Sequence, residues 1–126
     1  MPVMRVTSLP FNPAINIEQV LSQLSQTFSK QFNIDLVHIT ASWHYFQAGH
    51  YVVAGKNAEF QAESSHPLMV ELLAPDFTQQ QDMESMLEFI ANQLSKLTPV
   101  HKNNIFIEYR PAKSGWVFDQ GKIVSW

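Results

Sequence analysis

The feature that most constrains the fold of this chain is an internal duplication. Proline-bounded apolar segments begin each half, and their matching pairs are Pro2/Pro67, Met4/Met69 and Pro10/Pro75. The apolar stripe that follows also recurs, in the pairs Ile17/Met83, Val20/Met86, Leu21/Leu87, Leu24/Ile90 and Phe28/Leu94. Four further positions are identical, namely Ser29/Ser95, Lys30/Lys96, Ile39/Ile105 and Gly49/Gly115. Because the prolines, the glycine and the apolar spacing all recur, the sequence favours one strand–helix–strand unit that occurs twice.

Local patterns predict the elements of the first unit. Residues 3–7 are short and β-branched, which indicates a strand. Asn16 is a suitable N-cap with Gln19 three residues later, and apolar residues from Ile17 onward follow helical spacing. Residues 36–46 alternate with period 2, which predicts a strand. One face would carry Val37, Ile39, Ala41, Trp43 and Tyr45, and the other His38, Thr40, Ser42 and His44.

The second unit repeats this order. Residues 68–73 predict a strand, Thr78 is expected to cap the next helix with Gln81 at its third position, and residues 105–110 predict another strand. Residues 51–61 indicate a hairpin around Gly55 that connects the units. Gly121 is expected to turn a last hairpin between Trp116–Phe118 and Ile123–Trp126.

These elements predict an α+β fold in a single domain over 1–126, with pseudo-repeats at 1–50 and 66–118. Two tandem β-α-β units side by side give a four-stranded sheet with both helices on one face, plus a short C-terminal hairpin. No third helix remains to cover the opposite face of the sheet, which must be exposed to solvent or covered by another subunit. The aromatic C-terminal tail either packs on a neighbouring subunit or folds back on its own sheet.

Composition excludes several classes of protein. Apolar residues make up 45% of the chain, which argues against disorder. The net charge of -3 and the scattered basic residues give no patch for nucleic acid. There is no cysteine, so disulfides and thiolate chemistry are excluded. No secretory pattern and no apolar run of membrane-spanning length is visible, so we expect a cytoplasmic protein that does not enter a membrane.

Histidine and serine motifs do not predict a site. His38 and His44 share a predicted strand face, but six residues span about 20 Å, which is too far for one metal ion. The polar-face interpretation is therefore preferred, and no metal site is expected. Ser64, Ser65 and His66 lack the strand–turn–helix context of a hydrolase nucleophile.

The beginning of the chain, MPVMRV, and the later stretch NIFIEY followed by Gly115-Trp116 resemble the tautomerase superfamily. That superfamily includes 4-oxalocrotonate tautomerase (4-OT) and macrophage migration inhibitory factor. Residues 67–71 and 79–82 are similar to a bacterial branch of it. The resemblance implies a homotrimer whose sheets line a central barrel, with active sites between subunits. It also implies that Pro2, once Met1 is removed, is the general base, in a reaction that needs no metal or cofactor.

The resemblance further implies a small keto–enol acid as the substrate. Arg5 and Lys30 are the candidates for binding the acid. Phe106 and Glu108 occupy strand positions where macrophage migration inhibitory factor has a tyrosine and an asparagine, so they are candidate substrate-binding residues. The bacterial branch often has an arginine at the end of its third strand, where this chain has Ala74-Pro75-Asp76, and Arg110 could pair with Glu108 instead. Aromatic residues and scarce arginine favour an arylpyruvate-like substrate over a dicarboxylate.

Two interpretations of Pro2 stay open at this point. It is either the catalytic amine or a proline that simply begins a strand, where the missing N–H matters little. Its repeat partner, Pro67, lies mid-chain and has no free amine. The alternative function is a non-catalytic protein of the same fold that binds a small ligand or a protein partner.

Overall fold

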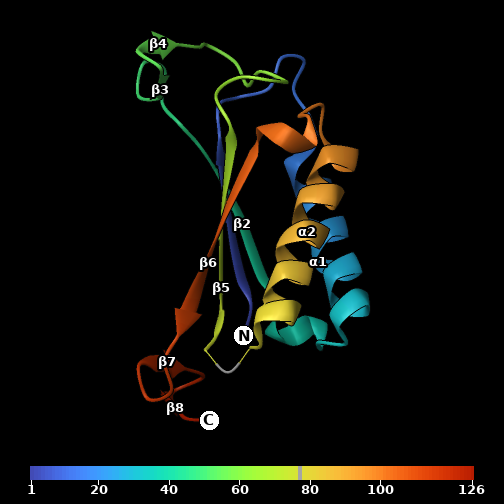
Figure 1. Ribbon diagram of the computed structural model, residues 1–126, viewed down its shortest axis with the longest axis vertical. Helices are drawn as coiled ribbons and strands as arrows, with labels where there is room; N and C mark the ends of the chain where they lie inside the picture. Colours follow the sequence, from blue (N-terminus) through green and yellow to red (C-terminus); the bar gives the residue numbers. More distant parts are fainter. Residues whose placement is uncertain (77) are drawn as a thin grey trace.

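A computed structural model describes residues 1–76 and 78–126 (Figure 1). It contains one four-stranded sheet, two α-helices, two 3-10 helices and two small hairpins. The first unit consists of β1 (Val3–Ser8), α1 (Ile17–Phe32), the 3-10 helix η1 (Leu36–His38) and β2 (Thr40–Tyr45). The connecting hairpin is β3 (Val52–Val53) and β4 (Lys56–Asn57). The second unit and the last hairpin are β5 (Leu68–Pro75), α2 (Gln80–Leu97), η2 (Lys102–Asn104), β6 (Ile105–Ala112), β7 (Val117–Asp119) and β8 (Lys122–Val124).

The four-stranded sheet has the order β2-β1-β5-β6. Each unit contributes a parallel pair, β1 with β2 and β5 with β6. The two units meet where β1 and β5 pair in antiparallel fashion, with Val6 opposite Val70. This mixed sheet, built from two successive β-α-β units, is the predicted fold.

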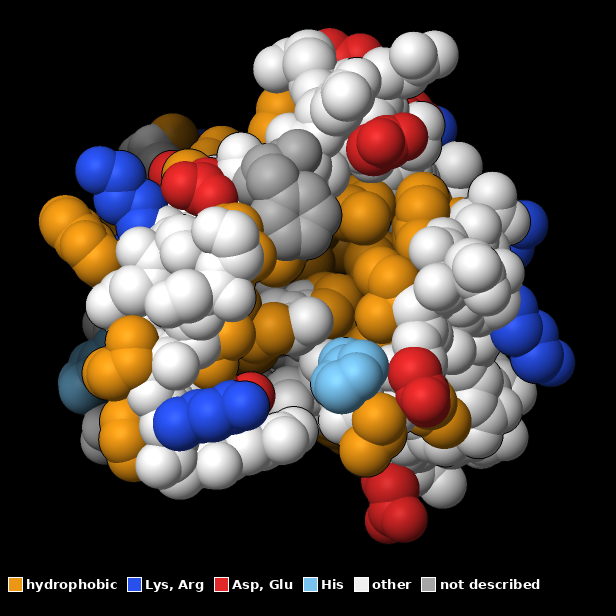
Figure 2. Space-filling model, turned by 90° about the horizontal axis from the view of Figure 1, so that it is seen from below, with side chains coloured by type: hydrophobic (Ala, Val, Ile, Leu, Met, Phe, Trp, Pro, Cys, Tyr) orange, Lys and Arg blue, Asp and Glu red, His pale blue; other side chains and the backbone are white. Residues whose placement is uncertain are grey.

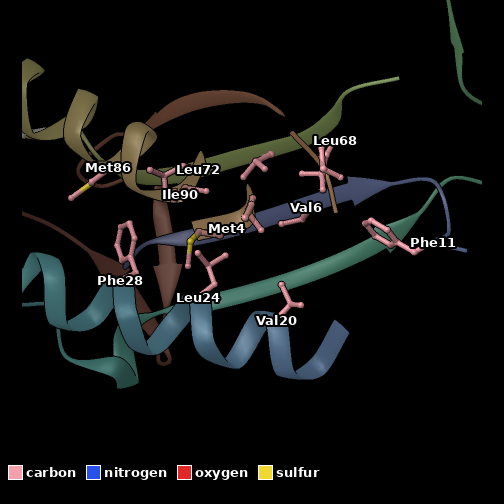
Figure 3. Close-up of a cluster of buried hydrophobic side chains, with 13 residues drawn as sticks. Met4, Val6, Phe11, Val20, Leu24, Phe28, Leu68, Leu72, Met86 and Ile90 are labelled. Carbon is pink, nitrogen blue, oxygen red and sulfur yellow. The ribbon is translucent and has the colours of Figure 1, made fainter. Parts of the chain in front are cut away.

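Both helices pack on one face of the sheet, as Figure 1 shows. Strand alternation sends Met4 and Val6 of β1 toward the helices, whereas Arg5 points to the opposite, helix-free face. The apolar stripe of α1 supplies Val20, Leu24 and Phe28 to the same core, and Figure 3 shows these side chains converging on β1 and β5. The core is thus a single layer between sheet and helices.

One predicted strand is shorter than its sequence pattern. The alternation over residues 36–46 is interrupted, because Leu36–His38 form a 3-10 helix and β2 begins only at Thr40. The cause is local: the Asp35 carboxylate accepts a 3.3 Å bond from the Val37 N–H, and the His38 N–H donates to the Asp35 carbonyl. Of the five residues predicted to share one face, Ile39, Ala41 and Trp43 pack against the core, whereas Val37 and Tyr45 are exposed. His38 instead lies beyond the strand.

The two helix starts differ. Asn16 caps α1 as expected, because its Oδ1 accepts a 3.1 Å bond from the Gln19 N–H. The expected Thr78 cap of α2 is wrong: Gln79 occupies the N-cap and makes no side-chain capping bond. The Thr78 hydroxyl donates to the Pro75 carbonyl at 2.9 Å and is therefore used at the end of β5.

Both predicted hairpins form. Gly55 and Gly121 have positive φ of 75° and 81°, which a tight two-residue turn requires. The β7–β8 hairpin lies beyond the end of β6 (Figure 1), with Trp116 79% and Phe118 70% exposed. None of the helices in residues 1–76 and 78–126 is long and apolar enough to cross a membrane.

Candidate active site

Pro2 lies buried immediately before β1. Its carbonyl accepts a 3.0 Å hydrogen bond from the Thr40 N–H, which fixes it at the beginning of both parallel strands. It lines a cavity of about 570 Å³, here called the proline pocket. The described residues that line it are Met1, Pro2, Phe32, Ile34, Ala74, Pro75, Thr78, Gln79, Asp82 and Met86.

The proline pocket forms where α1 ends and α2 begins. Asn33 ends α1 in the left-handed conformation, with φ of 52°. The next residue, Ile34, is held by Ser29 in two ways: the Ser29 hydroxyl donates to the Ile34 carbonyl at 2.6 Å, and the Ile34 N–H donates to the Ser29 carbonyl at 3.1 Å. Figure 2, which views this end of the molecule, shows a hollow in which hydrophobic side chains gather.

A second, smaller cavity of about 290 Å³ adjoins the first and is called the hairpin pocket. It lies between the sheet end and the β7–β8 hairpin. Its described lining residues are Met1, His38, Pro75, Asp119, Gln120, Lys122, Val124 and Trp126. Met1 and Pro75 line both cavities. The two cavities are therefore neighbours with a common wall.

The two pockets that Met1 lines differ in the charged side chains they contain. Among the described residues, the lining of the proline pocket includes Asp82 but no lysine or arginine. The hairpin pocket includes Asp119, Lys122 and His38. Burial lowers the pKa of the Met1 amino group below its ordinary value of 8.0, and the Asp119 carboxylate opposes this by raising it. An amine at this end of the chain is therefore less basic than one in water.

Three of the predicted substrate-binding residues lie elsewhere in the subunit. Arg5, Phe106 and Glu108 line a cavity of about 310 Å³ over the helix-free face of the sheet. Lys30 is exposed in the last turn of α1 and lines neither the proline pocket nor the hairpin pocket. A single subunit therefore does not bring these four residues to Pro2.

The arginines on the helix-free face are already paired. Arg5 Nη1 lies 3.1 Å from Glu71, while Arg110 Nε lies 3.3 Å from Glu71 and 2.9 Å from Glu108. The hydrogen bond that Arg110 donates to the Glu108 carboxylate is the main reason that the pKa of Arg110 is raised, with the charge of Glu71 adding to it. The expected pairing of Arg110 with Glu108 is confirmed.

Sequence reasoning missed the residues of the hairpin pocket. The sequence pattern places His38 on the polar face of a strand and gives no reason to single out Lys122. The turn at Gly121 could have located Lys122 in its hairpin, but no local pattern indicates that this hairpin lies against Met1. Within the described part of the chain, no group of three or more His, Asp or Glu side chains could hold a metal ion.

No protein-family model and no curated protein matches the sequence. Solved structures do match the fold over almost its full length. Pt0534 inactivated by 2-oxo-3-pentynoate has a TM-score of 0.77 at 13% identity, covering 98% of this chain and 94% of that one. A fused 4-OT, described as an asymmetric trimer, has a TM-score of 0.80 at 8% identity, covering 96% and 94%. Macrophage migration inhibitory factor from Oncomelania hupensis has a TM-score of 0.76 at 11% identity, covering 98% and 82%.

The chain has the tautomerase fold. The resemblance first noticed in the sequence is thus confirmed at the level of architecture. In this tautomerase fold, Pro2 is the residue that precedes the first strand, and it faces a cavity instead of solvent. At such low identities a shared fold does not transfer an activity, so the chemistry must be argued from the side chains.

Proposed function

We propose that the protein catalyses keto–enol proton transfer on a small 2-oxo acid, with the Pro2 amine as general base. The observation that carries the proposal is the burial of Pro2 in the proline pocket, at the first strand of a tautomerase fold. Removal of Met1 would convert the Pro2 nitrogen from an amide into a secondary amine. That amine would lie in a partly apolar cavity large enough for a small organic acid.

The environment suits a base that works near neutral pH. Burial disfavours an ammonium ion, and it already lowers the pKa of the Met1 amino group. Pro2 lines the proline pocket, so the apolar side chains of that pocket are expected to lower the pKa of its amine in the same way once Met1 is removed. The neutral amine would take the proton from the enol oxygen and deliver it to the carbon at the other end of the enol C=C bond, which leaves the keto acid and the regenerated amine.

We also propose a homotrimer. Its support is the fused 4-OT structures described as trimers, together with the unpartnered helix-free face of the sheet. On that face Phe106 is 53% and Met69 37% exposed. In a trimer, Arg5, Phe106 and Glu108 of one subunit could lie near the proline pocket of its neighbour. Their substrate-binding role, like that of Lys30, stays a prediction.

The test begins with untagged protein. Intact mass should show loss of Met1, and the processed protein should accelerate conversion of enol-phenylpyruvate, followed by ultraviolet absorbance. Pro2→Ala should remove at least 99% of that rate, since base catalysis contributes about 10²–10⁴-fold. A protein extended by a short peptide before Met1 is the matched control, because it keeps Pro2 but blocks its nitrogen. Retention of Met1 in untagged protein, or full activity of Pro2→Ala, would contradict the proposal.

A non-catalytic binding protein is the second candidate. It is favoured by the lining of the proline pocket, whose described residues offer no lysine or arginine to hold an enolate. This candidate predicts that processed protein binds aromatic acids without converting them. Light scattering tests the trimer separately, and a uniform monomer would contradict that part.

The remaining sequence predictions concern location and partners. Composition favours a cytoplasmic protein that does not bind nucleic acid, and the resemblance implies a reaction that needs no cofactor; all three stay predictions. Cell fractionation, assay of chelator-treated protein and a gel-shift measurement with mixed nucleic acid would check these three points.

A further inference from the structure

We propose that removal of Met1 joins the proline pocket and the hairpin pocket into one cavity, in which Lys122, assisted by His38, binds the carboxylate of the substrate. This inference rests on the proposed function and adds an acid-binding subsite from the same subunit. It also assigns the direction in which the substrate lies.

The first observation is that Met1 is the removable part of the wall between the two cavities. Met1 and Pro75 are the residues that line both. Pro75 is fixed, because its carbonyl accepts bonds from the Thr78 hydroxyl at 2.9 Å and the Tyr109 hydroxyl at 2.9 Å. Met1 is attached only through the Pro2 nitrogen. Its removal therefore exposes that nitrogen to the space that both cavities border.

The second observation is where the basic side chains lie around that nitrogen. Lys122 and His38 line the hairpin pocket, whereas the described lining of the proline pocket contains neither lysine nor arginine. Within the described part of the chain, no acidic group forms an ion pair with Lys122, although Asp119 is its cross-strand partner. Arg5 and Arg110, in contrast, are occupied by Glu71 and Glu108. Lys122 is thus a cation of the hairpin pocket that makes no ion pair with the described carboxylates.

Each of the two cavities then binds a different part of the substrate. A carboxylate at Lys122 places the carbonyl carbon next to the Pro2 amine and directs the rest of the molecule into the proline pocket. That pocket offers Phe32, Ile34 and Met86 to an apolar substituent. A second carboxylate there would meet Asp82. The arrangement therefore selects a monocarboxylic 2-oxo acid with an apolar substituent over a dicarboxylic acid of similar length.

The hairpin that carries Lys122 is held in place. The Trp126 indole donates to Asp76 Oδ1 at 2.8 Å, and the Gly115 N–H donates to the Val124 carbonyl at 2.9 Å. The first bond ties the end of the chain to the segment after β5, and the second closes the base of the β7–β8 hairpin. Lys122 is therefore presented to the cavity by an anchored element.

The experiment uses processed, full-length protein and the variants Lys122→Gln, Lys122→Arg and Lys56→Gln. Lys56 is the matched control, since it is also an exposed lysine in a two-stranded hairpin, at the opposite end of the molecule (Figure 1). Lys122→Gln should raise KM for enol-phenylpyruvate about tenfold with a smaller change in kcat, as expected for loss of a charge-assisted contact. The methyl ester should show no such change. Lys122→Arg should recover most of the KM, and Lys56→Gln should behave as the wild type.

Binding of 3-phenylpropanoate, measured by calorimetry, gives a readout that needs no turnover. It should weaken about tenfold in Lys122→Gln and be lost in protein extended before Met1. Equal binding to the wild type and Lys122→Gln would overturn the inference. If Pro2→Ala also abolishes turnover, the proposed function stands and only the Lys122 subsite fails. Normal turnover by Pro2→Ala, with weak binding by Lys122→Gln, would instead refute the base and retain the subsite.

Discussion

The indole Nε1 of Trp126 lies 2.8 Å from Oδ1 of Asp76 and donates a hydrogen bond to it. This bond joins the C-terminal hairpin to the segment between β5 and α2. The Trp126 N–H adds a 2.8 Å bond to the Ser114 hydroxyl within the hairpin. The wall of the hairpin pocket thus depends on a contact between residues far apart in the sequence.

Trp126→Phe should loosen this wall while keeping an aromatic ring. Loss of one partly exposed hydrogen bond should lower the free energy of unfolding by only about 1 kcal/mol. Binding of an aromatic acid to processed protein should weaken more than stability does, because the hairpin carries Lys122. Denaturant unfolding and calorimetric binding measure the two effects. A large loss of stability with unchanged binding would contradict this role.

Asp119→Asn should lower the pKa of the amino group at the beginning of the chain. In protein that retains Met1, the Asp119 carboxylate raises the pKa of the Met1 amine and so opposes the larger effect of burial. Without that charge, the ammonium form loses its stabilising partner, and half-protonation moves to lower pH. An NMR titration of the amine would detect the change, and Glu63→Gln, on a distant carboxylate paired with His101, is the control.

In processed protein, the same substitution should extend activity to lower pH, since the base form of Pro2 would persist further into acid. The rate is expected to rise with pH through the amine pKa, because only the neutral amine accepts a proton. A pH–rate profile that does not move in Asp119→Asn would show that Asp119 does not act on Pro2.

Asn16→Ala should destabilise the protein by about 1 kcal/mol, because it removes the side-chain cap of α1. Gln79→Ala should change stability by less than about 0.5 kcal/mol, since Gln79 makes no capping bond at α2. The pair compares the N-cap positions of the two helices by thermal and denaturant unfolding. Equal losses would mean that the two helix starts are not distinguished by capping.

Leu24→Ala should destabilise the protein by roughly 2–5 kcal/mol. Leu24 is fully buried, and Figure 3 shows it between α1 and the sheet. Gln23→Ala, one residue earlier on the exposed side of α1, should be within about 0.5 kcal/mol of the wild type. Comparable losses in both variants would contradict the single core layer.

The duplication made most of the fold predictable. Residues such as Leu24 and Ile90 recur at the same place in both units, so the helix faces and the sheet could be predicted before any coordinates. The predictions for Thr78 and for residues 36–38 were wrong, because a hydroxyl or carboxylate near a strand end can bond to several backbone groups. Only the arrangement in space decides which bond forms.

The site was less predictable than the fold. Pro2 could be predicted as a site residue because its place at the beginning of the chain is visible in the sequence, and its catalytic role stays a proposal. Lys122 was not, because its proximity to Met1 depends on how the last hairpin lies against the sheet end. A long-range bond such as Trp126 to Asp76 leaves no periodic pattern that a sequence could reveal.

Met1 and Trp126 both line the hairpin pocket, and this has a practical consequence for anyone who handles the protein. A purification tag or fluorescent label fused before Met1 would keep the Pro2 nitrogen acylated, and one fused after Trp126 would emerge beside Lys122. A tag at either end of the chain is therefore expected to disturb the site. The β3–β4 hairpin, at the opposite end of the molecule, is where a reporter should be inserted (Figure 1).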